Sequence, residues 1–171
     1  MKFDGLAVKL YTIKQLMNMD MNFDDYKDLV YKIVGASINV QKELNWGLLE
    51  NIYTEALHYE LLDLGILNEK QKYLPCFYKN RVLNTHYQMD IVVENKIIIE
   101  LKSVSSLISG HRAQLFNYMR LTRKRVGLLI NFGEPTVQVE RYGLIDSTNE
   151  CILLDKDMQP VQKRHIPFKN F

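Results

Sequence analysis

The sequence predicts one domain of the α/β (α+β) class, in which helices flank a central mixed β-sheet of four to five strands. Residues 22–64 repeat apolar side chains at helical spacing. Residues 72–103 are rich in β-branched and aromatic residues and are broken by short polar turns. Helical spacing returns at 110–124, and two extended runs follow at 125–143. The expected order of elements is therefore α-α-β-β-β-α-β-β.

The composition is that of an ordinary globular domain with a core. The chain has 171 residues, 47% hydrophobic and 25% charged, and a net charge of +2 that is too small to indicate a polyanionic partner by itself. We expect a loose N-terminal extension at 1–21, the domain at 22–143, and a C-terminal extension at 144–171 that packs on the domain or trails from it.

The expected location is a reducing cytoplasm. Asp4 and Lys9 interrupt the region where an export signal needs apolar residues, and no apolar run approaches the ~20 residues of a membrane span. We therefore expect no membrane contact. Cys76 and Cys151 lack metal-ligand spacing and are expected to be reduced thiols.

Local signals bound the two expected helices. Asn22 can cap the first helix, and the acidic pair that follows it favours the positive end of a helix. The tripeptide "NWG" at 45–47 ends this helix. The second helix is expected at about 48–64, ended by Gly65.

Three charges interrupt the hairpin expected at 89–103, "MDIVVENKIIIELKS". If "ENK" is a three-residue turn with Asn95 in a left-handed conformation, Asp90 lies opposite Glu100. One face of the hairpin is then wholly apolar, from Met89 to residue 101, and the other gathers Asp90, Glu100 and Lys102 at its open end. A two-residue turn would instead place the two acids on opposite faces.

Paired carboxylates on a buried hairpin need a compensating charge. Like charges directly opposed destabilise a sheet, and buried carboxylates cost several kcal/mol when nothing offsets them. A divalent cation such as Mg²⁺ or Mn²⁺ would offset them, with Lys102 beside it to steady a metal-bound water or a phosphate. The alternative is a salt bridge between Lys102 and one acid at the rim of the sheet.

The charged cluster resembles the motif of the PD-(D/E)XK nuclease superfamily, with Asp90 followed by Glu100-Leu101-Lys102. Three further stretches strengthen the resemblance. "GLLENIY" at 47–53 is similar to the signature of the GxxExxY protein family, a branch of that superfamily, and "GLLINFG" at 127–133 also resembles that family. "HRAQLFNY" at 111–118 is similar to the Q-x-x-x-Y motif of exonuclease-type members. The resemblance covers about residues 28–142 and implies a restriction-endonuclease-like core.

The resemblance implies roles for the charged residues. Asp90, Glu100 and the Leu101 backbone carbonyl would bind Mg²⁺, with Mn²⁺ as a substitute, and Lys102 would assist the attacking water. Glu50 would be a further metal ligand from the helix. From the residues alone, Glu50 is instead the third position of a capping box whose N-cap is Gly47. Tyr53, one turn later, is expected to pack or to supply a supporting hydroxyl.

Each of the further polar residues on the helix at 110–124 has two interpretations. Gln114 and Tyr118 are four apart and share a face, which is either an ordinary amphipathic edge or, by the resemblance, a place to orient Lys102 and meet a phosphate. His111 either contacts a phosphate or is a solvated residue at the helix start. Arg120 and Arg123 either complement the helix dipole or border a groove that tracks a nucleic-acid strand.

The function predicted from all of this is metal-dependent hydrolysis of phosphodiester bonds in DNA, with RNA left open. Little sequence specificity is expected because one small domain has little room for a sequence-reading module. The Q-x-x-x-Y resemblance favours exonucleolytic action, and a homo-oligomer is plausible for an enzyme that encloses its strand. The alternative is a catalytically inactive nucleic-acid-binding or assembly protein that keeps the nuclease fold. The aromatic residues Trp46, Tyr73, Tyr78 and Tyr87 suit either base stacking or packing in the core or on a face of the sheet.

Overall fold

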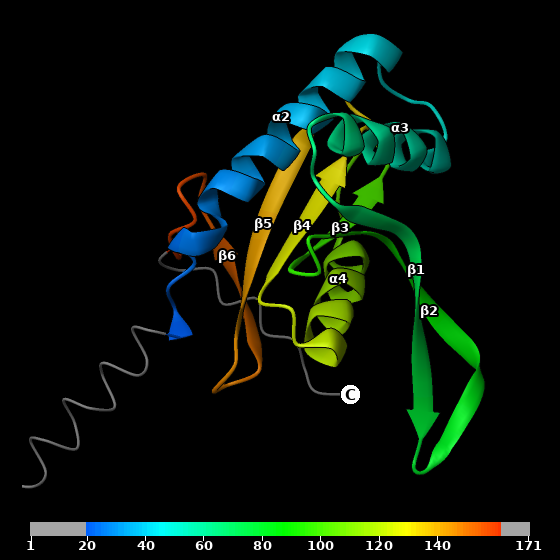
Figure 1. Cartoon of the computed structure of the whole chain (residues 1–171), viewed down its shortest axis with the longest axis vertical. Coiled ribbons are helices and arrows are strands. Elements are labelled where there is room, and N and C mark those ends of the chain that lie inside the picture. Colours follow the sequence, from blue (N-terminus) through cyan, green and yellow to red (C-terminus); the bar gives the residue numbers. More distant parts are fainter. Residues whose placement is uncertain (1–19, 162–171) are drawn as a thin grey trace, which may run out of the picture.

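The computed structural model describes residues 20–161 and contains one six-stranded sheet with helices on both faces (Figure 1). The strands follow one another across the sheet in chain order, β1-β2-β3-β4-β5-β6. The elements are η1 (Asp24–Tyr26), α2 (Lys27–Leu44), α3 (Glu50–Asp63), β1 (Asn68–Tyr78), β2 (Arg81–Val93), β3 (Ile97–Lys102), α4 (Ser109–Thr122), β4 (Val126–Asn131), β5 (Gln138–Ile145) and β6 (Glu150–Leu154).

The sheet is mixed, as expected, but it has one strand more than the expected four to five. Strands β3 and β4 are parallel and are joined through α4, and the other neighbours are antiparallel. The extra strand is β6, which pairs with β5 from Arg141↔Leu154 to Ile145↔Glu150. Residues 144–154 therefore continue the sheet and are not an appendage to it.

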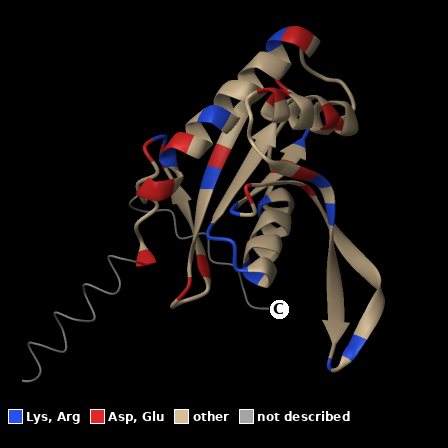
Figure 2. Ribbon diagram, in the orientation of Figure 1, with Lys and Arg blue, Asp and Glu red and all other residues tan. Residues whose placement is uncertain are grey.

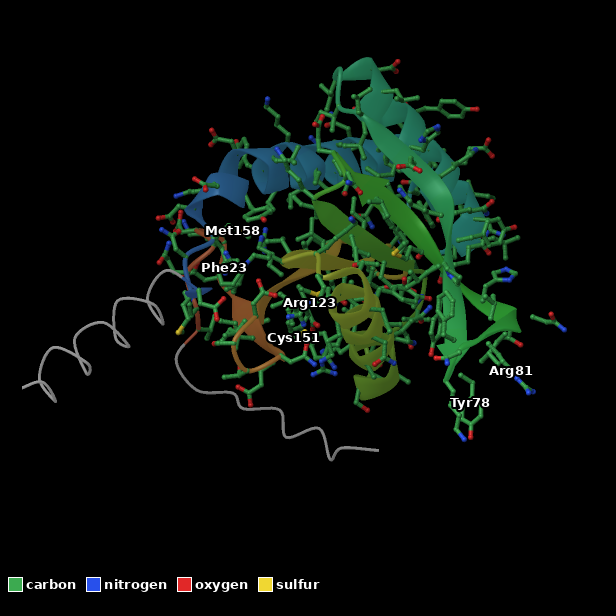
Figure 3. The ribbon with its side chains drawn as sticks, turned by 60° about the horizontal axis from the view of Figure 1, so that its bottom comes forward. Phe23, Tyr78, Arg81, Arg123, Cys151 and Met158 are labelled. Carbon is green, nitrogen blue, oxygen red and sulfur yellow. The ribbon has the colours of Figure 1, made fainter. Side chains whose placement is uncertain are left out.

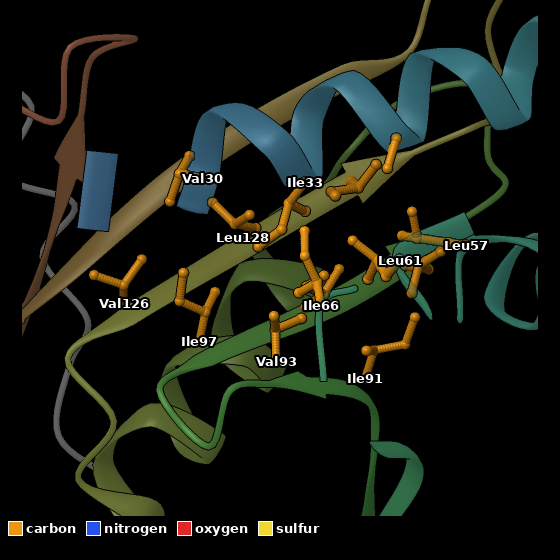
Figure 4. Close-up of a cluster of buried hydrophobic side chains, with 14 of the residues drawn as sticks. Val30, Ile33, Leu57, Leu61, Ile66, Ile91, Val93, Ile97, Val126 and Leu128 are labelled. Carbon is orange, nitrogen blue, oxygen red and sulfur yellow. The ribbon is translucent and has the colours of Figure 1, made fainter. Parts of the chain in front are cut away.

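Two apolar clusters fill the space between the sheet and its helices. The larger lies under α2 and α3 and includes Val30, Leu57, Ile91, Ile99 and Leu128 (Figure 4). The smaller lies under α4. The central strands β3 and β4 are buried along their whole lengths, as continuous apolar runs in a parallel pair require.

The hairpin register predicted from the "ENK" turn is confirmed. The pairs are Ile91↔Ile99, Val92↔Ile98 and Val93↔Ile97. Both Glu94 and Asn95 have positive φ, 51° and 52°. Met89 departs from the expected face, because it packs in the smaller cluster on the α4 side rather than with Ile91.

The helix ends differ from the expected ones by a few residues. Asn22 accepts a hydrogen bond from the Asp24 N–H at 2.8 Å, but Phe23 is the N-cap of η1 and Tyr26 that of α2, so Asn22 is not the helix cap that was expected. Asn45, with φ of 60°, ends α2 where the "NWG" break was expected. Helix α3 begins at Glu50 with Leu49 as its N-cap, so Gly47 is not the cap.

The expected extensions are only partly within the described residues. Asp20 accepts hydrogen bonds from the backbone of Asp146 and Ser147 in the β5–β6 turn. The expectations for 1–19 and 162–171 lie outside the described residues. Cys76 and Cys151 are free thiols, and burial raises the pKa of Cys151 to about 11. Among helices of the described chain, none is long and apolar enough to cross a membrane.

Candidate active site

The structure brings Asp90, Glu100 and Lys102 together at the carboxyl end of β3. Glu100 is fully buried and Lys102 is 8% exposed, in a strand that has neighbours on both sides. Asp90 lies on β2, and its Oδ2 accepts a hydrogen bond from the Leu101 N–H at 2.7 Å. That bond holds the Asp90 carboxylate against β3, where its charge acts on Glu100.

The Lys102 ammonium lies at the centre of the cluster. Its Nζ donates to Glu100 Oε1 at 2.6 Å and to the Leu101 carbonyl at 2.8 Å. Glu50 Oε1 lies 3.6 Å from the same nitrogen. One cation therefore contacts three of the four groups that were expected to bind metal, while the fourth, Asp90, acts on it through its charge.

The protonation of the cluster reflects three acids around one base. Burial raises the pKa of Asp90 to about 6, against the Leu101 hydrogen bond and the Lys102 charge, which lower it. Burial, and then the charge of Asp90, raise the pKa of Glu100. Burial lowers the pKa of Lys102, but the Glu100 charge and hydrogen bond outweigh it and raise that pKa overall. The raised pKa of Lys102 favours its ion pair with Glu100, whereas the raised pKa of Glu100 opposes that pair. The 2.6 Å contact between Lys102 Nζ and Glu100 Oε1 supports the ion pair. One ammonium nevertheless cannot neutralise three carboxylates.

The oxygen atoms of these residues are of the kind that binds a hard cation, but they are not arranged around a vacant cation position. The Glu100 Oε2 atom is buried and has no hydrogen-bond partner among the described residues. An orphaned, buried carboxylate oxygen beside a second carboxylate is the donor set that Mg²⁺ or Mn²⁺ takes. Within residues 20–161, no three His, Cys, Asp or Glu side chains are gathered as a ready-made metal group. The Lys102 ammonium stands among these oxygens instead, so metal binding would require it to shift.

Glu50 faces the cluster from the start of α3 and is not a helix cap. No side chain caps α3, and the Glu50 carboxylate points to Lys102. The loop before it is held by Tyr53, whose hydroxyl donates to the Asn45 carbonyl at 2.8 Å and accepts from the Leu48 N–H at 3.1 Å. The Tyr53 ring stacks on Phe132 at 4.4 Å. The supporting role expected for Tyr53 is therefore what the structure has.

Helix α4 contributes less to the cluster than expected. Burial, and then the charge of Lys102, lower the pKa of His111, and its Nδ1 accepts from the Ile108 N–H at 3.3 Å. Gln114 donates to the Tyr118 hydroxyl at 3.0 Å rather than to Lys102. Tyr118 is 2% exposed and donates to the Gln88 carbonyl at 3.1 Å. In this arrangement Tyr118 is a packing residue, which corrects the expected phosphate contact.

Arg120 and Arg123 lie away from the cluster, contrary to the expected groove. Nine residues of helix, about 14 Å, separate Arg120 from His111. Arg120 donates to the Asn149 carbonyl at 3.0 Å, and Arg123 donates to the Asn149 side chain at 2.9 Å. Both cations therefore tie the end of α4 to the β5–β6 turn. The charged cluster lies at the opposite end of the same helix.

Asn131 supports the site and was missed from the sequence. It is fully buried at the end of β4, beside Lys102 in the parallel ladder. Its side chain accepts from the Val104 N–H at 2.9 Å and donates to the Val104 carbonyl at 2.8 Å. This pair of bonds fixes the chain just after the Glu100–Lys102 stretch. An asparagine at a strand end gave no sequence signal that separates it from an ordinary turn residue.

A half-buried polar group lies on the α4 side of the sheet. Arg112 pairs with Glu140 through two nitrogens, and Glu140 also accepts from the Tyr142 hydroxyl at 2.6 Å. A separate groove of about 580 Å³ lies between α2 and residues 135–141, lined by Gln41, Lys42 and Arg141 among others. Neither feature touches the charged cluster.

Comparison with known proteins agrees with the geometry. The family model described as the PD-(D/E)XK nuclease superfamily matches residues 27–142, which include every residue of the cluster. A search of curated proteins finds no match. The solved structure of SSO0001 is similar at 16% identity and a TM-score of 0.44, over 86% of this chain and 83% of that one, which carries no argument about function.

Proposed function

Because the chain belongs to the PD-(D/E)XK nuclease superfamily, with a restriction-endonuclease-like fold, we propose that it is a metal-dependent nuclease that hydrolyses phosphodiester bonds in DNA. One observation carries the proposal. Glu50 and Glu100 contact one buried ammonium, Asp90 is held against the same strand through the Leu101 N–H, and Glu100 keeps an oxygen without a partner in the described chain. Such an arrangement costs stability unless a cation completes it. The "GLLENIY" signature supports the GxxExxY branch within the superfamily.

The proposed cofactor is Mg²⁺, with Mn²⁺ as a substitute. Asp90, Glu100 and the Leu101 carbonyl would hold it, with Glu50 as the ligand from α3. When bound, the ion supplies an acidified water and charge stabilisation at the phosphate. Lys102 keeps its proton at neutral pH, because Glu100 raises its pKa, so the ammonium can stabilise negative charge that develops on a phosphate oxygen.

The remaining roles follow from position. Gln114 orients Tyr118, which in turn fixes the strand before Asp90 through the Gln88 carbonyl. His111, half-buried at the site end of α4, is the phosphate contact that we propose on this helix. We infer low sequence specificity and leave exonucleolytic action and a homo-oligomer as parts of the same proposal.

The test compares wild type, Lys102→Ala and the exposed control Lys156→Ala on linear and circular DNA, single and double stranded, with Mg²⁺ or with EDTA. Lys156 is 85% exposed on the side chain, so its loss matches the charge change without touching the site. We expect metal-dependent cleavage by wild type and control, and at least a ~100-fold loss in Lys102→Ala. Loss of the linear forms alone would identify an exonuclease.

Two outcomes would contradict the proposal. Undiminished cleavage by Lys102→Ala would mean that a contaminant or another site cuts DNA. A wild-type protein that binds DNA but never cuts it with Mg²⁺ or Mn²⁺ would favour a non-catalytic nucleic-acid-binding or assembly protein that retains the fold.

A further inference from the structure

Strands β1 and β2 extend beyond the sheet as a two-stranded arm (Figure 1). We call residues 73–88 the hairpin arm. Its strands pair with each other through Leu74↔Tyr87, Phe77↔Val82 and Tyr78↔Arg81, whereas β2 reaches β3 only at residues 91–93. All of residues 81–88 are exposed. The arm is thus a hydrogen-bonded element that packs on the domain near Leu74 and Tyr87 and is exposed along its tip, residues 77–86.

The hairpin arm exposes several large aromatic side chains to solvent. Tyr73 is 64%, Phe77 63% and Tyr78 62% exposed, and Tyr87 is 39% exposed. A run of large exposed rings on one element marks a binding surface. Figure 3 shows the side chains of Tyr78 and Arg81 extending outward from the end of the arm.

The charge of the arm selects the kind of partner. Residues 70–89 contain no acid. At the base, Lys70 and Lys72 are paired with Glu55 and Glu69. At the tip, Lys79 and Arg81 form no ion pair within residues 20–161, and Lys79 Nζ lies 5.5 Å from the Tyr78 ring centre. Figure 2 shows only basic colour at this end of the arm. Rings interleaved with unpaired cations suit bases and phosphates.

The arm leads directly into the charged cluster. Strand β2 forms one side of the arm up to Gln88, and Asp90 follows two residues later on the same strand. At the junction the Tyr87 ring lies 5.5 Å from that of Tyr118, and Tyr118 donates to the Gln88 carbonyl. From Arg81 to Asp90 the strand spans about 30 Å. A nucleic-acid strand lying along the arm would therefore reach the site without leaving the protein surface.

We propose that the hairpin arm binds unpaired nucleotides of the nuclease substrate, with its rings stacking on bases and Lys79 and Arg81 contacting phosphates. This inference rests on the proposed function for the identity of the substrate. Unpaired nucleotides fit better than a duplex, because bases must be unstacked from each other to lie on protein rings. A second copy of the chain fits less well, because two acid-free tips that met across a two-fold axis would repel.

A binding assay without metal tests the hairpin arm separately from cleavage. Fluorescence anisotropy in EDTA would follow an oligothymidylate of about 20 nucleotides, its oligouridylate equivalent, and a blunt duplex of the same length. The ring variant is Phe77→Ala with Tyr78→Ala, and the charge variant is Lys79→Gln with Arg81→Gln. The matched control is Tyr31→Ala with Lys156→Gln, since Tyr31 is an 80% exposed ring on α2, outside the arm.

We expect the ring variant to weaken single-strand binding by at least about tenfold and the control to leave it unchanged. The charge variant should reduce the slope of log K against log salt concentration by about 1.4, or ~0.7 for each lost phosphate contact. Duplex binding should fall less than single-strand binding. If both arm variants bind single strands as wild type does, or if wild type binds no oligonucleotide, the proposal is overturned.

Two further measurements distinguish this proposal from a dimer interface and from the nuclease proposal. Light scattering detects a protein interface: if the ring variant turns a dimer into a monomer and keeps its affinity for oligonucleotides, the arm binds a second copy instead. Cleavage of a small phosphodiester, which is too short to touch the arm, isolates the chemistry. Arm-dependent binding without any cleavage would refute the nuclease proposal alone, and cleavage with arm-independent binding would refute the arm alone.

Discussion

Replacing Asp90 by Asn should stabilise the metal-free protein at neutral and higher pH. The substitution keeps the shape of the side chain and an oxygen that can accept the Leu101 N–H, but it removes one of three carboxylates around Lys102. Burial raises the pKa of Asp90 from 3.8 to about 6. That shift corresponds to about 3 kcal/mol of unfavourable ionisation in the folded state. Partial exposure screens it, so we expect about 2 kcal/mol.

The sign of the pH dependence follows from the raised pKa. Between pH 3.8 and about 6 the folded wild type binds more protons at Asp90 than the unfolded chain does, so its stability falls as the pH rises through that window and stays reduced above it. Asparagine does not titrate. The variant should therefore match wild type near pH 4 and exceed it at pH 8 by roughly 4–8 °C in Tm.

Thermal unfolding with Mg²⁺ completes the test. Wild type at a concentration of Mg²⁺ about 100-fold above Kd should gain ~2.7 kcal/mol, and the variant much less. Asp63→Asn, an exposed carboxylate on α3, is the matched control and should change stability by less than ~0.5 kcal/mol. If Asp90→Asn were less stable than wild type at pH 8 without metal, or if Mg²⁺ stabilised both equally, the reasoning about an uncompensated cluster would be refuted.

Three substitutions around the site have predictable costs. Tyr53→Phe removes a hydroxyl bonded to two backbone groups of the 45–49 loop and should lower the free energy of unfolding in urea by about 1–3 kcal/mol; an unchanged value would mean that water replaces the hydroxyl. Asn131→Ala leaves the Val104 N–H and carbonyl unpaired and should cost about 2–3 kcal/mol in the same assay, whereas under 1 kcal/mol would show that this segment is not clamped. Gly133→Ala would drive a Cβ into the Val104 backbone, so we expect a lower Tm than for Asn131→Ala; a wild-type Tm would contradict the close approach.

The hairpin could be predicted from sequence because its evidence is local. A polar tripeptide between apolar runs fixes the turn, and the turn fixes which side chains share a face. That argument placed Asp90 with Glu100 and Lys102, and the pairing confirms its register. It failed at Met89, where the chain leaves β3 and the arm begins, because alternation along a strand says nothing about where the strand twists off the sheet.

Residues whose role depends on distant segments could not be predicted. Arg120 and Arg123 sit in a basic run that suits a groove equally well until the β5–β6 turn is known to meet them. Glu50 satisfied a capping pattern, and only the position of Lys102 shows that it faces the cluster. Asn131 acts through Val104, 27 residues away, and β6 came from a tail whose short apolar patch is a weak signal by itself.

The cluster has a buried side and an accessible side. Glu100 is enclosed in a central strand, while the Glu50 side chain is 38% exposed at the tip of a helix that follows an exposed loop. If the proposed metal site is correct, an ion arriving from solvent, or a chelator removing one, would therefore meet Glu50 first. The rate of ion exchange would then depend on how firmly the stacked Tyr53 ring keeps that loop in place.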